Sequence, residues 1–110
     1  MIKGMSQNEE IEVNKNGGKQ SKIGYGFHLA DPKAMFRLSE VLYRGANKYE
    51  RDNWRKISAE EHLNHALAHA YAWMAKDGQD DHAGHFFCRA MMFLAMAIEE
   101  DEKEDKKESK

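Results

Sequence analysis

The 110-residue sequence has one cysteine, one proline and no apolar run of the length that a membrane-spanning helix needs. A lone cysteine, Cys88, cannot form a disulfide within the chain, which suits a reducing compartment. The N-terminal residues also lack the apolar core of a signal peptide. We therefore expect a cytoplasmic protein with no membrane segment.

The sequence has no excess of basic residues either. Its 17 lysines and arginines are balanced by 19 aspartates and glutamates, which gives a formal net charge of −2. Proteins that hold nucleic acid through its phosphates usually carry a basic surplus, so direct nucleic-acid binding is not expected. The length suits one small domain with a modest core, and we expect the chain to self-associate.

The sequence also has no convincing run of alternating apolar and polar residues, the pattern that marks half-buried strands. The sequence therefore favours an all-α fold, a small helical bundle completed by oligomerisation. Residues 1–21 are polar and contain Gly17-Gly18, and we expect them to form a flexible arm. Asp31-Pro32 predicts the start of a helix over about 32–48, because aspartate caps a helix and proline suits its first position.

A second helix is predicted by a capping box, in which Ser58 is followed three residues later by Glu61. This helix should span about 59–76 and stop near Gly78, since glycine commonly follows the last turn of a helix. The connection before it has aromatic residues and no helical periodicity, so we expect a loop there.

The third predicted helix spans about 81–101, and either Asp80 or Asp81 can cap it. The chain then becomes almost wholly charged, which indicates a solvated C-terminal tail at 102–110. The predicted helical domain is therefore 22–101.

Each predicted helix combines apolar and polar stripes. On the first helix, Glu40 lies between Phe36 and Tyr43, opposite the stripe that should be buried. The stripes expected to be buried are Met35, Leu38, Val41, Leu42 and Gly45 on the first helix, Leu63, Leu67, Ala70 and Met74 on the second, and Phe87, Met91, Leu94 and Ile98 on the third.

Histidines form a line along the second helix. His62, His65 and His69 share one face, because they are three and four residues apart. Such a line could be functional, or it could be a hydrogen-bonded group in the core or on the surface. Ligation of one metal ion by all three is disfavoured, since the side chains are spread over two turns.

The third helix is apolar nearly all round, so we expect it to be central. His82, His85 and Arg89 run through it at spacings of three and four. An unpaired buried arginine is very costly, so Arg89 needs a partner. Glu40, an acidic loop residue or a bound phosphate could serve.

The polar lines of the three helices form one cleft if they converge. Carboxylates suit hard divalent cations such as Mg²⁺, and lysine and arginine suit polyphosphate. With histidines as proton acceptors, this combination suggests metal-assisted hydrolysis of a phosphoric anhydride. The same residues could instead form an internal ion-pair network.

Three segments resemble the N-terminal domain family of phage-encoded dATP/dGTP diphosphohydrolases. They are "LSEVLYRGANKYERDNW" (38–54), "ALAHAYAWMAKDGQDD" (66–81) and "HAGHFFCRAMMFL" (82–94). The family in turn is similar to the MazG-like all-α nucleotide pyrophosphohydrolases. The resemblance covers about residues 17–100, and the block from Gly45 to Trp54 is its most specific part.

The resemblance implies cleavage of a purine deoxynucleoside triphosphate to the monophosphate and pyrophosphate, with Mg²⁺ or Mn²⁺ as cofactor. It also implies a homodimer or homotetramer, in the host cytoplasm if the protein is phage-encoded. The catalytic residues it suggests are Glu40, His69 and His85. The metal ligands would come from Glu40, Asp77, Asp80 and Asp81. The substrate-binding residues would be Lys48, Tyr49, Asn53, Trp54, His82 and Arg89.

The chain departs from the MazG-like pattern in its acidic residues. It lacks core Glu-x-x-Glu and Glu-x-x-Asp pairs, and Glu99-x-x-Glu102 lies near the charged tail. A second hypothesis therefore stays open, in which a catalytically inactive helical protein binds a nucleotide or a host protein. A structural oligomer without a ligand is a third.

Overall fold

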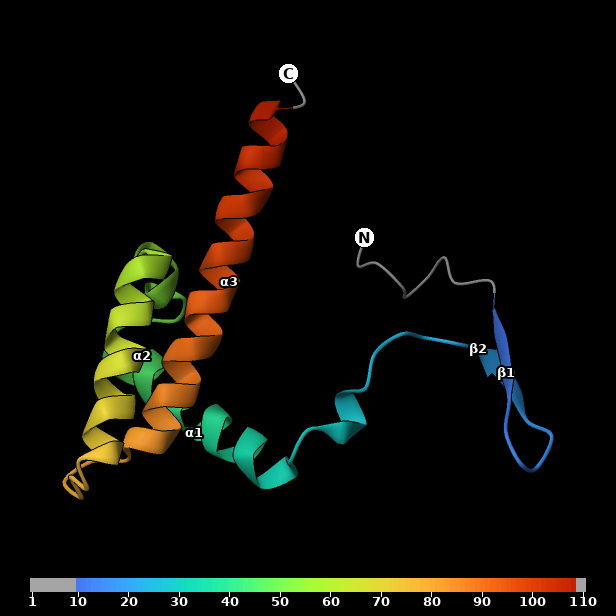
Figure 1. Ribbon diagram of the computed structural model, residues 1–110, viewed down its shortest axis with the longest axis horizontal. Helices are drawn as coiled ribbons and strands as arrows, with labels where there is room; N and C mark the ends of the chain where they lie inside the picture. Colours follow the sequence, from blue (N-terminus) through green and yellow to red (C-terminus); the bar gives the residue numbers. More distant parts are fainter. Residues whose placement is uncertain (1–9, 109–110) are drawn as a thin grey trace. The chain divides into compact units, whose positions relative to one another are not determined.

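The computed structural model describes residues 10–108 (Figure 1). It divides into one unit that ends at Asp31 and another that begins at Pro32. The elements of the first unit are the antiparallel strands β1 (Ile11–Val13) and β2 (Lys19–Ser21) and the short 3₁₀ helix η1 (Phe27–Leu29).

The β-hairpin of the first unit was not predicted, because each strand is only three residues long and fully exposed. Its turn is held by polar contacts instead. The Asn14 side-chain oxygen accepts hydrogen bonds from the backbone N–H groups of Asn16 and Gly18, each at 2.9 Å. Gly17 adopts a φ of 84°, a conformation that glycine reaches at little cost.

The second unit confirms the predicted all-α fold. Its elements are α1 (Pro32–Lys48), the 3₁₀ helix η2 (Asn53–Lys56), α2 (Ala59–Met74) and α3 (His82–Glu108). Helices α2 and α3 lie side by side, and α1 packs against α3 (Figure 1). In the described part of the chain, no helix is both long and apolar enough to cross a membrane.

The helix boundaries follow the predicted caps at the start of α2 and differ at two ends. The capping box of Ser58 and Glu61 is present. Helix α3 continues to Glu108 rather than ending near 101, because the charged residues that follow Ile98 are compatible with an exposed helix.

The end of α2 was predicted near Gly78, but the chain leaves the helix earlier. Ala75 is the C-cap, and Lys76 takes the left-handed position with a φ of 66°. The Lys76 N–H donates to the Trp73 carbonyl at 3.0 Å and the Asp77 N–H to the Ala72 carbonyl at 3.1 Å. These two bonds form a Schellman motif, which here places a lysine where glycine is usual.

Replacing Lys76 with glycine should therefore stabilise the protein. A left-handed lysine is strained by its Cβ atom, and its removal should raise the free energy of unfolding by about 0.5–1 kcal/mol. Urea denaturation measures this change. The matched control is Ala75→Gly, at a φ of −78°, which should lower stability; an equal response of the two variants would contradict the prediction.

The core of the helical unit is small. Its buried apolar residues are Leu38, Ala59, Ala66, Cys88 and Met96. Helix α2 turns one face inward, on which Ala59, His62 and Ala66 are all buried. Small alanine side chains at this spacing let two helices approach closely, which explains why this face of α2 packs against α3.

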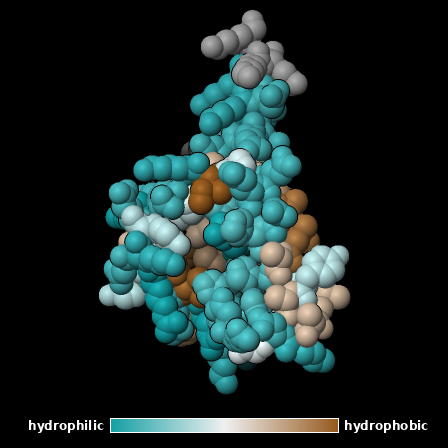
Figure 2. Space-filling view, turned by 90° about the vertical axis from the view of Figure 1, so that its left-hand side faces the viewer, coloured by the Kyte–Doolittle hydropathy of each residue, from teal (hydrophilic) through white to brown (hydrophobic). Residues whose placement is uncertain are grey.

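The predicted leucine stripe of α2 is therefore not buried within the chain. Leu63, Leu67 and Met74 are exposed, as are Leu94 and Ile98 of α3. Apolar patches interrupt the mostly hydrophilic surface (Figure 2). The prediction that these stripes form the core was wrong for a single chain, because helical periodicity identifies a stripe but not the surface that covers it.

Candidate functional site

Five side chains gather where α2 ends and α3 begins. They form the group that we call the His–Asp cluster: His69, Asp77, Asp80, His82 and His85. The cluster depends on the connection between the helices, because the Schellman motif turns the chain at Asp77 and α3 begins five residues later.

A chain of three polar groups runs through the cluster. His82 Nε2 lies 2.5 Å from Asp77 Oδ2, and His82 Nδ1 lies 3.0 Å from His69 Nδ1. The His82 side chain is 11% exposed and that of Asp77 40% exposed. The carboxylate therefore fixes the His82 ring at the edge of the helix pair.

The other two members lie beside His69. The rings of His69 and His85 stack at a centroid distance of 5.2 Å and an interplanar angle of 19°. His85 Nε2 is 3.6 Å from Asp80 Oδ1. Burial, together with the neighbouring His85 and His82, lowers the pKa of His69 below its ordinary value, so a neutral imidazole that can accept a proton or bind a metal is favoured at this position.

Asp81 belongs to a second network that joins α1 to α3. Its carboxylate caps α3 by accepting the Gly84 N–H at 3.2 Å, and it accepts from Arg37 Nη1 at 2.9 Å. The hydrogen bond from Arg37 lowers the pKa of Asp81. A Cβ atom at Gly84 would collide with this carboxylate and press against Arg37, so glycine permits the contact between the helices.

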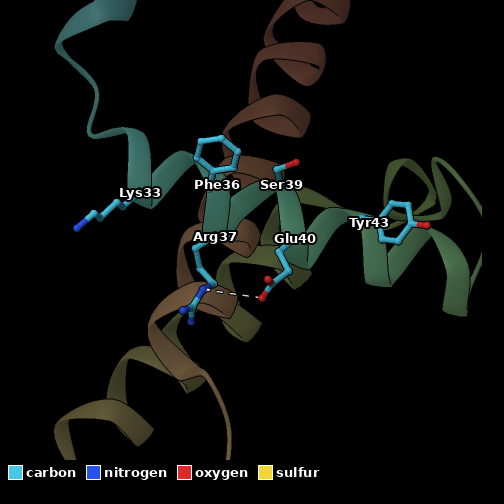
Figure 3. A pocket seen from close by; sticks show the side chains of 6 residues that line it. All are labelled: Lys33, Phe36, Arg37, Ser39, Glu40 and Tyr43. Atoms are coloured by element: carbon cyan, nitrogen blue, oxygen red, sulfur yellow. Dashed lines mark ion pairs between the residues drawn. The ribbon is translucent and has the colours of Figure 1, made fainter.

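Glu40 lies at the other end of this network. Arg37 Nε is 3.9 Å and Arg44 Nη2 is 3.6 Å from its carboxylate. Arg37 and Glu40 extend from one side of α1, whereas Phe36 and Ser39 extend from the other (Figure 3). Arg37 thus connects the predicted Glu40 to Asp81, at the first turn of α3.

The buried His62 forms a third group with Trp54 and Arg89, and its ring lies between them. His62 Nε2–H donates to the Trp54 carbonyl at 2.9 Å, and Arg89 Nη1 donates to His62 Nδ1 at 3.1 Å. His62 is fully buried, and this burial lowers its pKa below the ordinary value. The partner expected for Arg89 was Glu40, an acidic loop residue or a bound phosphate. The structure shows the imidazole of His62 in place of a carboxylate, and a phosphate partner stays a prediction.

The remaining predicted substrate-binding residues lie outside the His–Asp cluster. Lys48 Nζ lies 5.0 Å above the Tyr49 ring, and the Arg55 guanidinium lies 4.3 Å above the Trp54 ring. Asn53 begins η2. Within residues 10–108, no hydrogen bond or ion pair joins these residues to the cluster, so one chain divides the predicted cleft into separate groups.

Arg37 was missed altogether in the sequence analysis, as was the structural role of His62. Arg37 is one helical turn before Glu40, and that spacing could have revealed it as a cation on the same face. His62 was placed in the histidine line, but its role as a buried acceptor for Arg89 had no local signal. Its partners lie 8 and 27 residues away in the sequence.

The lowered pKa values of His62 and His69 predict a loss of stability on acidification. The fold favours their neutral forms, whereas an unfolded histidine has a pKa of about 6.5. Below that pH the unfolded chain takes up protons first, so stability should fall from about pH 6.5 towards the folded-state pKa values. Urea midpoints measured between pH 8 and about 5 test this prediction.

A His62→Gln variant should reduce this pH dependence, while the exposed His65→Gln should not. Asp81 contributes in a different pH window. Its pKa is lowered in the fold, so its carboxylate form stabilises the protein above the ordinary aspartate pKa of 3.8, and this stabilisation is lost only at lower pH. A midpoint that stays constant from pH 8 to 5 would contradict the role of the histidines.

A group with metal-binding geometry is present in the cluster. One ligand atom each of His69, Asp80 and His82 lies within 4.8 Å of the others. Of the other carboxylates predicted to bind metal, Asp77 contacts His82, and Asp81 and Glu40 are paired with arginines. The donor set on the described residues is therefore mixed nitrogen and oxygen.

Comparison with known proteins adds a family. The family described as dATP/dGTP diphosphohydrolase, N-terminal, matches residues 14–106. No curated protein and no solved structure matches the chain. The match spans most of the sequence, including α1, α2 and the cluster at the start of α3, and so the chain belongs to the dATP/dGTP diphosphohydrolase N-terminal domain family.

Proposed function

We propose that this protein hydrolyses a purine deoxynucleoside triphosphate, dATP or dGTP, to the monophosphate and pyrophosphate. The observation that carries the proposal is the His–Asp cluster, which lies within the region that matches a family described as a dATP/dGTP diphosphohydrolase. Arginine and lysine side chains on α1 and α3 supply the positive charge that a triphosphate requires.

In this reaction, water attacks the α-phosphorus in line with the leaving pyrophosphate. His69 accepts a proton from that water, since its lowered pKa favours the neutral ring. His85 orients Asp80, and Asp77 orients His82. Arg37, which is paired with Asp81 at the first turn of α3, would neutralise phosphate oxygens. Arg89, Lys48, Tyr49 and Trp54 lie in groups separate from the cluster, and their roles in phosphate binding and base stacking stay predictions.

A divalent ion, Mg²⁺ or Mn²⁺, fits the carboxylates of the cluster. Asp77 and Asp80 would hold it, because their side chains are 40% and 52% exposed. Glu40 and Asp81 are already paired with Arg37 and would keep this arginine in place. When bound, such an ion supplies charge stabilisation for the phosphate oxygens.

The experiment is an assay of pyrophosphate release from all common dNTPs and NTPs, with Mg²⁺ or Mn²⁺. We expect release from dATP or dGTP and a matching amount of the monophosphate. Formation of inorganic phosphate and a diphosphate would mean that a different bond is cleaved. No product with any nucleotide or metal would overturn the proposal.

The second candidate function is binding without catalysis, to a nucleotide or to another protein. The observation in its favour is the exposed apolar surface on α2 and α3. Calorimetry with dATP and dGTP, in parallel with the assay, separates the two candidates. Nucleotide binding without turnover would support the second.

Self-association is a further part of the proposal, because exposed leucines on α2 form an apolar surface that a second protein surface would bury. We propose that a second copy of the chain covers Leu63 and Leu67, which are 38% and 45% exposed. Light scattering should give at least a dimer. The double variant Leu63→Ser/Leu67→Ser should shift it towards the monomer, while the control Phe27→Ser, in the other unit, should not. A wild-type monomer at micromolar concentration would contradict self-association.

A further inference from the structure

We propose that His69, His82 and Asp80 form a binding site for a transition-metal ion such as Zn²⁺ or Co²⁺, with Asp77 as the carboxylate that orients His82. This site shares Asp80 with the Mg²⁺ or Mn²⁺ site proposed above, and it is an alternative to that site with a mixed nitrogen and oxygen donor set. The inference concerns metal binding and holds whether or not the protein hydrolyses nucleotides.

The separation of the two imidazole nitrogens matches a shared ion. His69 Nδ1 and His82 Nδ1 are 3.0 Å apart. In a tetrahedral zinc site with Zn–N distances of 2.0–2.1 Å, two nitrogen ligands are about 3.3 Å apart. The observed separation of the two nitrogens is therefore within a few tenths of an ångström of the separation in a zinc site.

The contact with Asp77 prepares His82 for this role. When Nε2–H donates to the Asp77 carboxylate, the neutral ring carries its free lone pair on Nδ1, the atom that faces His69. A carboxylate behind a ligating histidine is the usual outer partner of metal sites, since it fixes the ring and increases its basicity. This arrangement supplies a second, independent feature that points to a ligand.

Asp80 supplies the third donor. Its carboxylate lies near His85 Nε2, at 3.6 Å, and within 4.8 Å of the ligand atoms of both other residues. The side chain is 52% exposed, so the site opens to solvent on its side. Three protein ligands with an open position are typical of zinc sites that bind water or substrate.

The chemistry of the donor set selects the class of ion. Two imidazoles and one carboxylate suit Zn²⁺, Co²⁺ or Ni²⁺, whereas Mg²⁺ prefers oxygen ligands and retains its waters. The charges also balance, because a divalent ion offsets the two negative charges of Asp77 and Asp80. The carboxylate of Asp81 is already neutralised by Arg37.

Another explanation of the 3.0 Å contact is an ordinary hydrogen bond, in which one Nδ1 is protonated and the other accepts. That pair needs no ion. The two explanations differ in what happens when metal is added, because only the metal site requires lone pairs on both Nδ1 atoms. Metal titration therefore distinguishes them directly.

The test uses the untagged full-length chain. Equilibrium dialysis and calorimetry with Zn²⁺, Co²⁺ and Mg²⁺ should show one tightly bound Zn²⁺ or Co²⁺ per chain and at least tenfold weaker binding of Mg²⁺. His69→Ala and His82→Ala should each weaken Zn²⁺ binding at least tenfold. Asp77→Asn should weaken it about 10- to 100-fold, as expected for an outer carboxylate.

The matched control is His65→Ala, since His65 is exposed on the same helix, one turn before His69. Its affinity should equal that of the wild type. Circular dichroism without metal shows whether each variant is folded. Binding that survives in the folded His69→Ala and His82→Ala variants, or its absence in the wild type, would overturn the proposal.

A measurement on the wild type avoids any loss of fold. Paramagnetic Co²⁺ at substoichiometric concentrations should broaden the imidazole resonances of His69 and His82 much more strongly than that of His65, which is exposed on the same helix. Equal broadening of all histidines would mean surface binding only and would also overturn the proposal. Because neither experiment uses a nucleotide, a negative result is distinct from failure of the hydrolysis assay.

Discussion

Replacing His62 with alanine should lower the free energy of unfolding by about 3 kcal/mol. The variant leaves a cavity at a fully buried position and removes the partner of two groups, the Trp54 carbonyl and the Arg89 guanidinium. Each unsatisfied buried group costs about 1–3 kcal/mol, and the cavity adds to this. For a small domain this is a large part of the total stability.

Urea denaturation monitored by circular dichroism measures the loss. The control is His65→Ala, which changes the same residue type at an exposed position of α2 and should alter stability by less than about 0.5 kcal/mol. Similar midpoints for the two variants would mean that His62 does not hold η2 to the helix pair.

A double-mutant cycle with Arg89→Met separates the contact between His62 and Arg89 from the cavity. If the 3.1 Å hydrogen bond is significant, the cycle should give a coupling energy of about 1 kcal/mol. Additive effects would show that the two residues act independently. Nucleotide binding by Arg89→Met, measured in parallel, tests the substrate role predicted from the sequence.

The largest effect on the proposed reaction is expected for Asp80→Asn. The change preserves the shape of the side chain and removes the charge that would hold a cation beside His69 and His82. Loss of about 3 kcal/mol of transition-state stabilisation corresponds to a roughly hundredfold fall in the rate of pyrophosphate release. The melting temperature should be nearly unchanged, because the side chain is half exposed.

The control for this variant is Asp101→Asn, an exposed aspartate on the distal part of α3. It should retain the wild-type rate. An active Asp80→Asn variant would exclude Asp80 as a metal ligand in the reaction. The same variant in the metal titration shows whether binding and turnover depend on one carboxylate.

The histidines of α2 illustrate how one polar stripe can serve two purposes. His62 is buried and held by Trp54 and Arg89. Two turns later His69 is half-buried and faces the cluster at the start of α3. The alternative of a hydrogen-bonded core group therefore describes His62, and the functional alternative stays a prediction for His69.

The sequence by itself determined the three α-helices of this protein. The capping box at Ser58 and the proline at position 32 mark helix starts through contacts within a few residues, and Asp81 caps α3 through Gly84. Local hydrogen bonds and backbone preferences suffice for such signals, which is why the helices were predicted well. The family was predicted as well, because its motifs are also short.

Only the tertiary structure decided which side of each helix faces the core. In α2 the stripe of Ala59, His62 and Ala66 is buried and the leucine stripe is exposed, although both have helical spacing. Small alanine side chains permit close packing against α3, and the energy of that packing depends on the partner surface. The same holds for Arg89, whose partner His62 is fixed by how α2 and α3 pack rather than by spacing along either helix.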